Sequence, residues 1–91
     1  MKVETARTGD EITHTVSGHI FFASADAFLD AFAVQEEIGK QVRLDLSRAQ
    51  FWDVTALGAL ETLVARYKAH GVTVEVTGLQ LNDSLHAPLQ L

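Results

Sequence analysis

The sequence predicts an α/β fold in which residues 1–91 form a single domain, with a four-stranded mixed sheet and helices packed mainly on one face. Three observations predict it: strand-like and helix-like segments alternate, the strand-like segments alternate polar with apolar residues, and two β-α-β crossovers follow one another. Right-handed crossovers between strands that run in one direction place both helices on the same face. The alternation within the strands indicates that the other face is open, because strands covered on both faces are apolar throughout.

The first forty residues predict two strands and a helix. Residues 2–7 alternate polar with apolar side chains, and a second strand over 11–17 places Ile12, His14 and Val16 on one face. The run Ile20-Phe21-Phe22 is expected to carry the chain into the core. Ser24 is the expected N-cap of a helix that Gly39 ends. The apolar positions at helical spacing are Ala25, Phe28, Leu29 and Phe32.

The second half predicts a strand, the clearest helix of the chain and a last strand. Alternation over residues 42–47 predicts the third strand, and alternation over 72–77 predicts the fourth. The helix between them runs from about Thr55 to His70, and Gly71 terminates it. A short last helix is expected around residues 83–86. The stripe that predicts the long helix consists of Ala56, Leu57, Leu60, Leu63, Val64 and Tyr67.

Charge and composition exclude several classes of function. The chain has seven Lys and Arg against twelve Asp and Glu, a net charge of −5, which disfavours binding to nucleic acid or to anionic lipid. Cysteine is absent, so disulfides and thiolate zinc sites are excluded. The sequence has no apolar run of the ~20 residues that span a bilayer and no signal pattern, so we expect a cytoplasmic domain without membrane insertion.

Catalytic and metal-binding patterns are missing from the sequence. The histidines at 14, 19, 70 and 86 have none of the usual ligand spacings, and no nucleophile elbow or glycine-rich phosphate loop occurs. The sequence therefore predicts no metal, no cofactor and no enzyme activity.

The segment Asp53-Val54-Thr55-Ala56 is the candidate functional site. It joins the third strand to the long helix, where backbone N–H groups and the helix dipole favour an anion or a phosphoryl group. A hydroxyl in the first turn can carry a phosphate. A purely structural interpretation, with Asp53 as N-cap and Thr55 as a first-turn residue, explains the same pattern.

Three short segments in order resemble the STAS domain family, the fold shared by anti-sigma-factor antagonists and the cytosolic ends of SulP sulfate permeases. They are VSGHIFFASA at residues 16–25, FWDVTAL at 51–57 and VEVTGL at 74–79. All three are similar to the permease branch. The antagonists carry Asp-Ser-Ser-Gly before the second helix. Here Val54 replaces the first serine, Thr55 the phosphorylated serine and Ala56 the glycine.

The resemblance implies a STAS-like domain with a regulatory, protein-interaction role in a transporter of sulfate or another inorganic anion. Its partner would be the transmembrane portion of the parent permease, at the cytosolic face of the inner membrane, or a cytosolic regulatory protein. One alternative is a free-standing antagonist-like switch protein phosphorylated at Thr55. Another is a module that binds a nucleotide or an anion at the start of the second helix.

Overall fold

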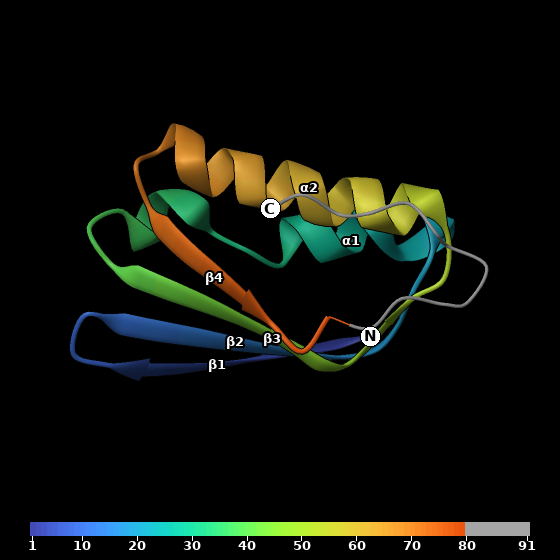
Figure 1. Ribbon diagram of the computed structural model, residues 1–91, viewed down its shortest axis with the longest axis horizontal. Coiled ribbons are helices and arrows are strands. Elements are labelled where there is room, and N and C mark those ends of the chain that lie inside the picture. Colours follow the sequence, from blue (N-terminus) through green and yellow to red (C-terminus); the bar gives the residue numbers. More distant parts are fainter. Residues whose placement is uncertain (80–91) are drawn as a thin grey trace.

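Four strands form one sheet in the order β1-β2-β3-β4 in the computed structural model, which describes residues 1–79 (Figure 1). Strand β1 (Lys2–Thr8) pairs antiparallel with β2 (Glu11–Ile20). Strands β2, β3 (Gln41–Phe51) and β4 (Thr73–Thr77) are parallel. The predicted mixed four-stranded sheet is therefore confirmed. The expected helix at residues 83–86 lies outside the described residues.

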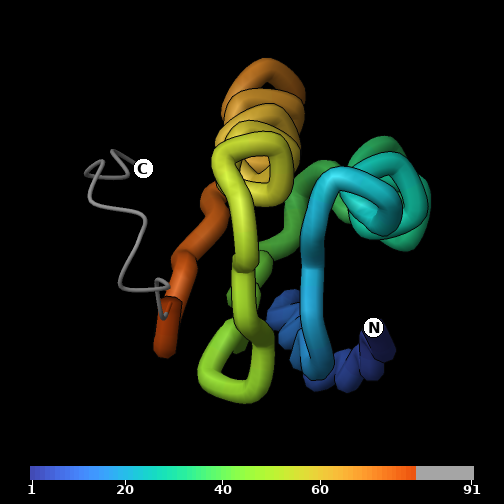
Figure 2. Tube along the Cα trace, turned by 90° about the vertical axis from the view of Figure 1, so that its right-hand side faces the viewer, coloured from blue at the N-terminus to red at the C-terminus, as the bar shows by residue number. Residues whose placement is uncertain are grey.

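The helices cover a single face of this sheet, as predicted. Helix α1 (Ala25–Asp30) lies in the crossover from β2 to β3, flanked by two short 3-10 turns, η1 (Phe22–Ser24) and η2 (Val34–Glu37). Helix α2 (Val54–Ala69) lies in the crossover from β3 to β4. The end-on view in Figure 2 shows both helices above the strands and none below them.

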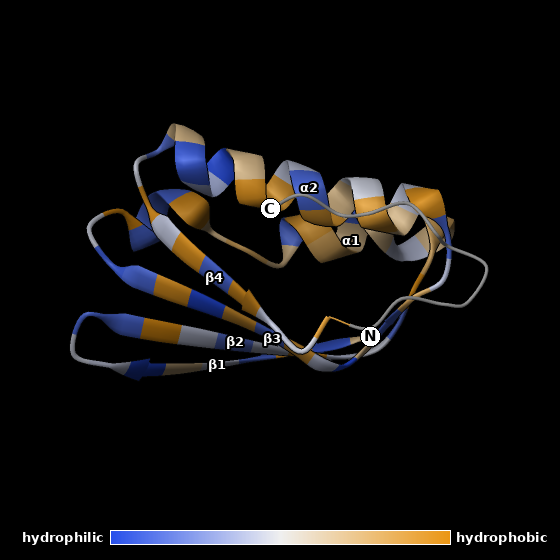
Figure 3. Cartoon of the chain, in the orientation of Figure 1, coloured by the Kyte–Doolittle hydropathy of each residue, from blue (hydrophilic) through white to orange (hydrophobic). Residues whose placement is uncertain are grey.

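The core lies between the helices and the sheet. Strands β2 and β3 alternate apolar and polar residues in Figure 3, and the apolar ones point toward the helices. The stripe of α2 packs against them, and Leu60, Leu63 and Tyr67 have no exposed surface. The buried apolar residues that the strands contribute are Ile12, Val16, Ile20, Val42, Leu44, Leu46, Ala49 and Phe51.

The first helix is shorter than predicted. It ends at Asp30 instead of continuing to Gly39, and Phe32 and Ala33 belong to neither helical segment. The reason is that Phe28, Val34 and Glu37 are all buried. A continuous helix with 3.6 residues per turn would rotate Val34 about 120° and Glu37 about 180° away from Phe28. The break allows all three side chains to reach the interior.

The prediction that the run Ile20-Phe21-Phe22 enters the core is wrong after its first residue. Ile20 is fully buried, whereas the side chains of Phe21 and Phe22 are 39% and 72% exposed. Strand β2 continues to Ile20, past the predicted end at Ser17, and η1 begins two residues later. Successive residues of a strand point to opposite faces, so Phe21 turns away from the core.

The side chain of Ser24 does not cap α1, although Ser24 occupies the N-cap position. Its hydroxyl oxygen instead accepts a hydrogen bond from the backbone N–H of Phe21 at 3.0 Å. The hydroxyl therefore stabilises the η1 turn. The predicted N-cap position of Ser24 is confirmed, but its side chain makes no capping bond to α1.

A chain of four hydrogen-bonded polar side chains crosses the core. The Nε2–H of His14 donates to Glu37 Oε2 at 2.7 Å, and the Tyr67 hydroxyl donates to Glu37 Oε1 at 2.5 Å. Thr5 Oγ1 lies 2.8 Å from His14 Nδ1. His14, Glu37 and Tyr67 are 4%, 1% and 0% exposed. These bonds connect β1, β2, η2 and α2, and they satisfy groups whose burial would otherwise be costly.

Strand β3 contains a β-bulge near its middle. Thr15 pairs with Asp45 and Ser17 pairs with Arg48, so β3 holds one extra residue there. The Asp45 carboxylate accepts from the backbone N–H of Ser47 at 3.0 Å and from its hydroxyl at 2.7 Å. These two bonds lower the pKa of Asp45 and fix the bulge. The backbone of Gly78 then passes directly over Ser47.

Candidate functional site

Asp53 holds together two loops at the carboxyl ends of β2 and β3. Its Oδ1 accepts a hydrogen bond from the backbone N–H of Ala56 at 2.8 Å, which caps α2 as the structural interpretation predicts. Its Oδ2 accepts from the backbone N–H of Phe22, also at 2.8 Å. One carboxylate therefore fixes both the start of α2 and the start of η1, two segments 31 residues apart in the sequence.

The four predicted site residues do not share one surface. Asp53 is half-buried, Val54 is 68% exposed, and Thr55 is exposed in the first turn of α2. Ala56 is fully buried beneath them. Val54 and Thr55 can therefore contact a partner, Asp53 organises the loop, and Ala56 belongs to the core. Thr55 is exposed, so its hydroxyl is open to a partner.

Exposed aromatic rings surround Asp53, a feature that the sequence analysis missed. His19, Phe21, Phe22, Trp52 and Asp53 line an open groove of about 370 Å³, which we call the aromatic groove. The rings of His19 and Trp52 lie with centroids 4.6 Å apart at a tilt of 41°, and those of Phe21 and Phe22 meet edge to face at 5.8 Å. Trp52 is 49% exposed. Large exposed apolar groups gathered in one place indicate an interaction surface.

Backbone hydrogen bonds fix the walls of the aromatic groove. The backbone N–H of Trp52 donates to the carbonyl of Ile20 at 2.9 Å, so the ladder between β2 and β3 continues to the groove. The Trp52 indole N–H donates to Gln50 Oε1 at 3.2 Å. With the bonds that hold Phe21 and Phe22, these contacts present the rings in one arrangement before any partner arrives.

The charge at this end opposes an anion. The first turn of α2 offers its dipole and free N–H groups, but the Asp53 carboxylate already occupies that position. A phosphate or nucleotide bound there would lie beside a like charge. Helix α1, which follows η1, adds Asp26 and Asp30 and has no basic residue.

The histidines among residues 1–79 do not gather into a metal site. No three His, Asp or Glu side chains among these residues are placed to hold a metal ion. His14 is buried against Glu37, the His19 ring lies against Trp52, and His70 bonds to the carbonyl of Arg66 near the end of α2. Within the same residues, no helix has the length and apolar character needed to cross a membrane.

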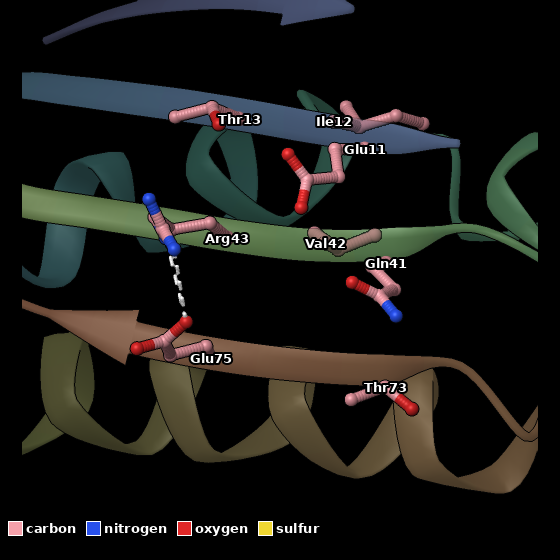
Figure 4. Close-up of a pocket in the computed structure, with 8 residues that line it drawn as sticks. All are labelled: Glu11, Ile12, Thr13, Gln41, Val42, Arg43, Thr73 and Glu75. Atoms are coloured by element: carbon pink, nitrogen blue, oxygen red, sulfur yellow. Dashed lines mark hydrogen bonds and ion pairs between the residues drawn. The ribbon is translucent and has the colours of Figure 1, made fainter. Parts of the chain in front are cut away.

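The open face of the sheet carries a second, smaller depression (Figure 4). Its volume is about 70 Å³, room for about two water molecules. Arg43 and Glu75, which face each other across β3 and β4, form an ion pair at 3.4 Å, so the one basic residue in its lining is already paired. The residues that line it are Glu11, Ile12, Thr13, Gln41, Val42, Arg43, Thr73 and Glu75. The aromatic groove is the stronger candidate because it is larger and apolar.

Comparison with known proteins supports this assignment of the fold. A family model described as STAS domain matches residues 2–84. The chain is 42% identical over 67 residues to the "Putative sulfate transporter YbaR" of Bacillus subtilis, a match that covers 74% of this chain and 14% of the relative. The chain thus spans only about a seventh of the length of that protein.

Two solved structures are also similar. An antisigma-factor antagonist STAS domain from Rhodobacter sphaeroides is 32% identical, covers 85% of both chains and has a TM-score of 0.79. A structure of a protein called Mglu is 31% identical with a TM-score of 0.70, and the match covers 85% of this chain and 19% of Mglu. The resemblance expected from the three sequence segments is therefore confirmed.

Proposed function

Because this chain belongs to the STAS domain family, we propose that it is a non-catalytic regulatory and interaction domain of a SulP-type transporter of sulfate or another inorganic anion. The observation that carries the proposal is the 42% identity to a protein named as a sulfate transporter. On this proposal the domain lies on the cytosolic side and contacts the membrane portion of the transporter.

The proposed contact surface is the end of the domain where β3 meets α2. Val54 and Thr55 are exposed there, beside the aromatic groove, and Asp53 holds the surrounding backbone. Loops at the carboxyl ends of parallel strands are the usual place for function in α/β folds. The exposed apolar rings next to these residues fit a role in binding.

The first test is the reading frame that encodes the chain. The proposal requires a series of apolar spans upstream of residue 1. A frame without them would contradict it and would favour the second candidate below.

The second test is anion uptake by host cells that carry the parent gene. We expect Val54→Asp to change the rate of sulfate uptake several-fold, because it places a charge on the proposed contact surface. Ile38→Asp is the matched control, since Ile38 is 54% exposed and lies before the start of β3, at the opposite end of the sheet. Equal uptake for both variants and the wild type, at equal protein levels, would refute the proposed surface.

The second candidate function is an antagonist-like switch protein regulated by phosphorylation of Thr55. The exposure of this hydroxyl in the first turn of α2 favours it, together with the 32% identity to an antisigma-factor antagonist. Mass spectrometry of the chain purified from its native host tests it directly. An unmodified Thr55 under all growth conditions would remove this candidate.

A further inference from the structure

We propose that the aromatic groove binds an arginine or lysine side chain from a basic, apolar segment of a partner protein. The inference rests on the proposed function, because it assigns the chemistry of the partner that docks at this end of the domain. It follows from three properties of the groove: the exposed aromatic rings, the single carboxylate and the absence of Lys and Arg from its walls.

The ring faces provide the first argument. Phe21, Phe22 and Trp52 expose their rings from two different loops around the same open space. Aromatic faces attract cations, tryptophan most strongly and arginine most often among the protein cations. The methylene groups of an arginine or lysine stem can pack on the same rings, so one side chain satisfies both features.

The Asp53 carboxylate provides the second argument. Its two oxygens each accept one backbone hydrogen bond, from Ala56 and from Phe22. A carboxylate offers about four lone-pair positions, so each oxygen can accept another donor from the groove side. A guanidinium or an ammonium supplies that donor and the opposite charge.

Charge complementarity identifies the partner. Residues 19–22 and 52–55, which form the groove and its rim, contain one acidic residue and no Lys or Arg. The whole chain has a net charge of −5. Cytosolic loops beside membrane spans carry an excess of Lys and Arg next to apolar residues. A second copy of this chain or an anionic lipid surface would instead bring like charge.

The test uses nuclear magnetic resonance of the 91-residue chain. The probe is a blocked peptide Gly-Leu-Arg-Leu-Gly, compared with the same peptide carrying neutral citrulline in place of arginine. Trp52 is the only tryptophan, so its indole N–H signal reports directly on the groove. We expect a saturable shift of this signal with the arginine peptide and about tenfold weaker binding of the citrulline peptide.

Matched variants distinguish the contribution of the aromatic rings to peptide binding from that of any apolar side chain. Phe22→Leu and Trp52→Leu each keep an apolar side chain and remove an aromatic ring. Each is expected to weaken binding of the arginine peptide about tenfold. For Trp52→Leu the backbone signal of Thr55 replaces the indole signal. Ile38→Ser, at an exposed apolar residue far from the groove, is expected to bind as the wild type does. Because the citrulline comparison uses the wild type, a variant that fails to fold leaves the test intact.

Four results would overturn the inference. The first two are equal binding of the two peptides and no shift of the indole signal with either peptide. The third is a shift of the indole signal when the chain self-associates without peptide, and the fourth is a shift only with vesicles of phosphatidylcholine and phosphatidylglycerol. The third would assign the groove to a second copy, and the fourth to a membrane surface. Failure here leaves the uptake difference between Val54→Asp and Ile38→Asp untouched, so the two proposals fail separately.

Discussion

Replacing Tyr67 with phenylalanine removes one hydroxyl from the core and is expected to lower the free energy of unfolding by about 1.5–3 kcal/mol, the usual contribution of a hydrogen bond to a charged group. The side chain has no exposed surface, and its hydroxyl donates to Glu37 Oε1. Water cannot replace the lost donor because Glu37 is itself 1% exposed. The ring stays in place, so no large cavity adds to the cost.

The contribution of Tyr67 depends on pH in a defined direction. Burial raises the pKa of Tyr67 far above its usual value, and the hydrogen bond to Glu37 and the charge of Glu37 raise it further. The unfolded chain ionises near pH 10, and the folded chain does so only at higher pH. The stabilisation is therefore complete below about pH 10. Above it, this residue lowers the free energy of unfolding by about 1.4 kcal/mol per pH unit.

Denaturant unfolding at a series of pH values measures both effects. The difference between wild type and Tyr67→Phe should be constant from neutral pH to about pH 10 and should shrink above it, since phenylalanine does not ionise. Thr62→Ala, which removes an exposed hydroxyl from the same helix, is the control and should change the free energy by less than about 0.5 kcal/mol.

Ultraviolet absorbance gives an independent reading, because Tyr67 is the only tyrosine in the chain. Tyrosinate should appear only as the chain unfolds. Ionisation near pH 10 with the circular dichroism of the folded state intact would refute the reasoning, as would a Tyr67→Phe variant as stable as the control.

Three further predictions concern the core, the site and the bulge. Leu60→Ala should cost about 2–5 kcal/mol in denaturant unfolding, because the side chain is fully buried; less than about 0.5 kcal/mol would contradict its place in the core. Thr55→Glu should leave the thermal melt nearly unchanged, since the residue is exposed and the helix dipole contributes about 0.3–1 kcal/mol; a loss of several kcal/mol would exclude it as a modification site. Gly78→Ala should cost at least about 1 kcal/mol, because its Cβ would lie 2.7 Å from that of Ser47 and φ is +70°; a wild-type melting temperature would show that the backbone there yields freely.

Periodicity predicted the sheet and α2 because both depend on one local rule. The apolar residues of α2 from Ala56 to Tyr67 that pack in the core lie on one helical face, and β2 to β4 keep theirs on one strand face. Both crossover helices lie on one side of the sheet, as predicted, because β2, β3 and β4 are parallel and such connections are right-handed.

The end of α1 and the aromatic groove could not be predicted in this way. Glu37 is buried because His14 and Tyr67, far from it in sequence, supply its partners, and no local pattern marks an acidic residue for the interior. Phe21 and Phe22 were expected in the core because they follow Ile20 in an apolar run. The extended backbone at Phe21 and the turn after it leave both side chains exposed. At Asp53 the N-cap was visible in the sequence, but its bond to Phe22 was not.

That bond makes the groove and the helix mutually dependent. A partner that draws Asp53 Oδ2 away from the backbone N–H of Phe22 loosens η1, and any change that shifts η1 alters the carboxylate that caps α2. Such coupling is reciprocal. If the partner changes the equilibrium of a modification at the start of α2 by some factor, the modification changes the affinity for the partner by the same factor. A cap contributes about 1–2 kcal/mol, so the coupling transmitted through this one carboxylate is bounded at roughly fivefold to thirtyfold.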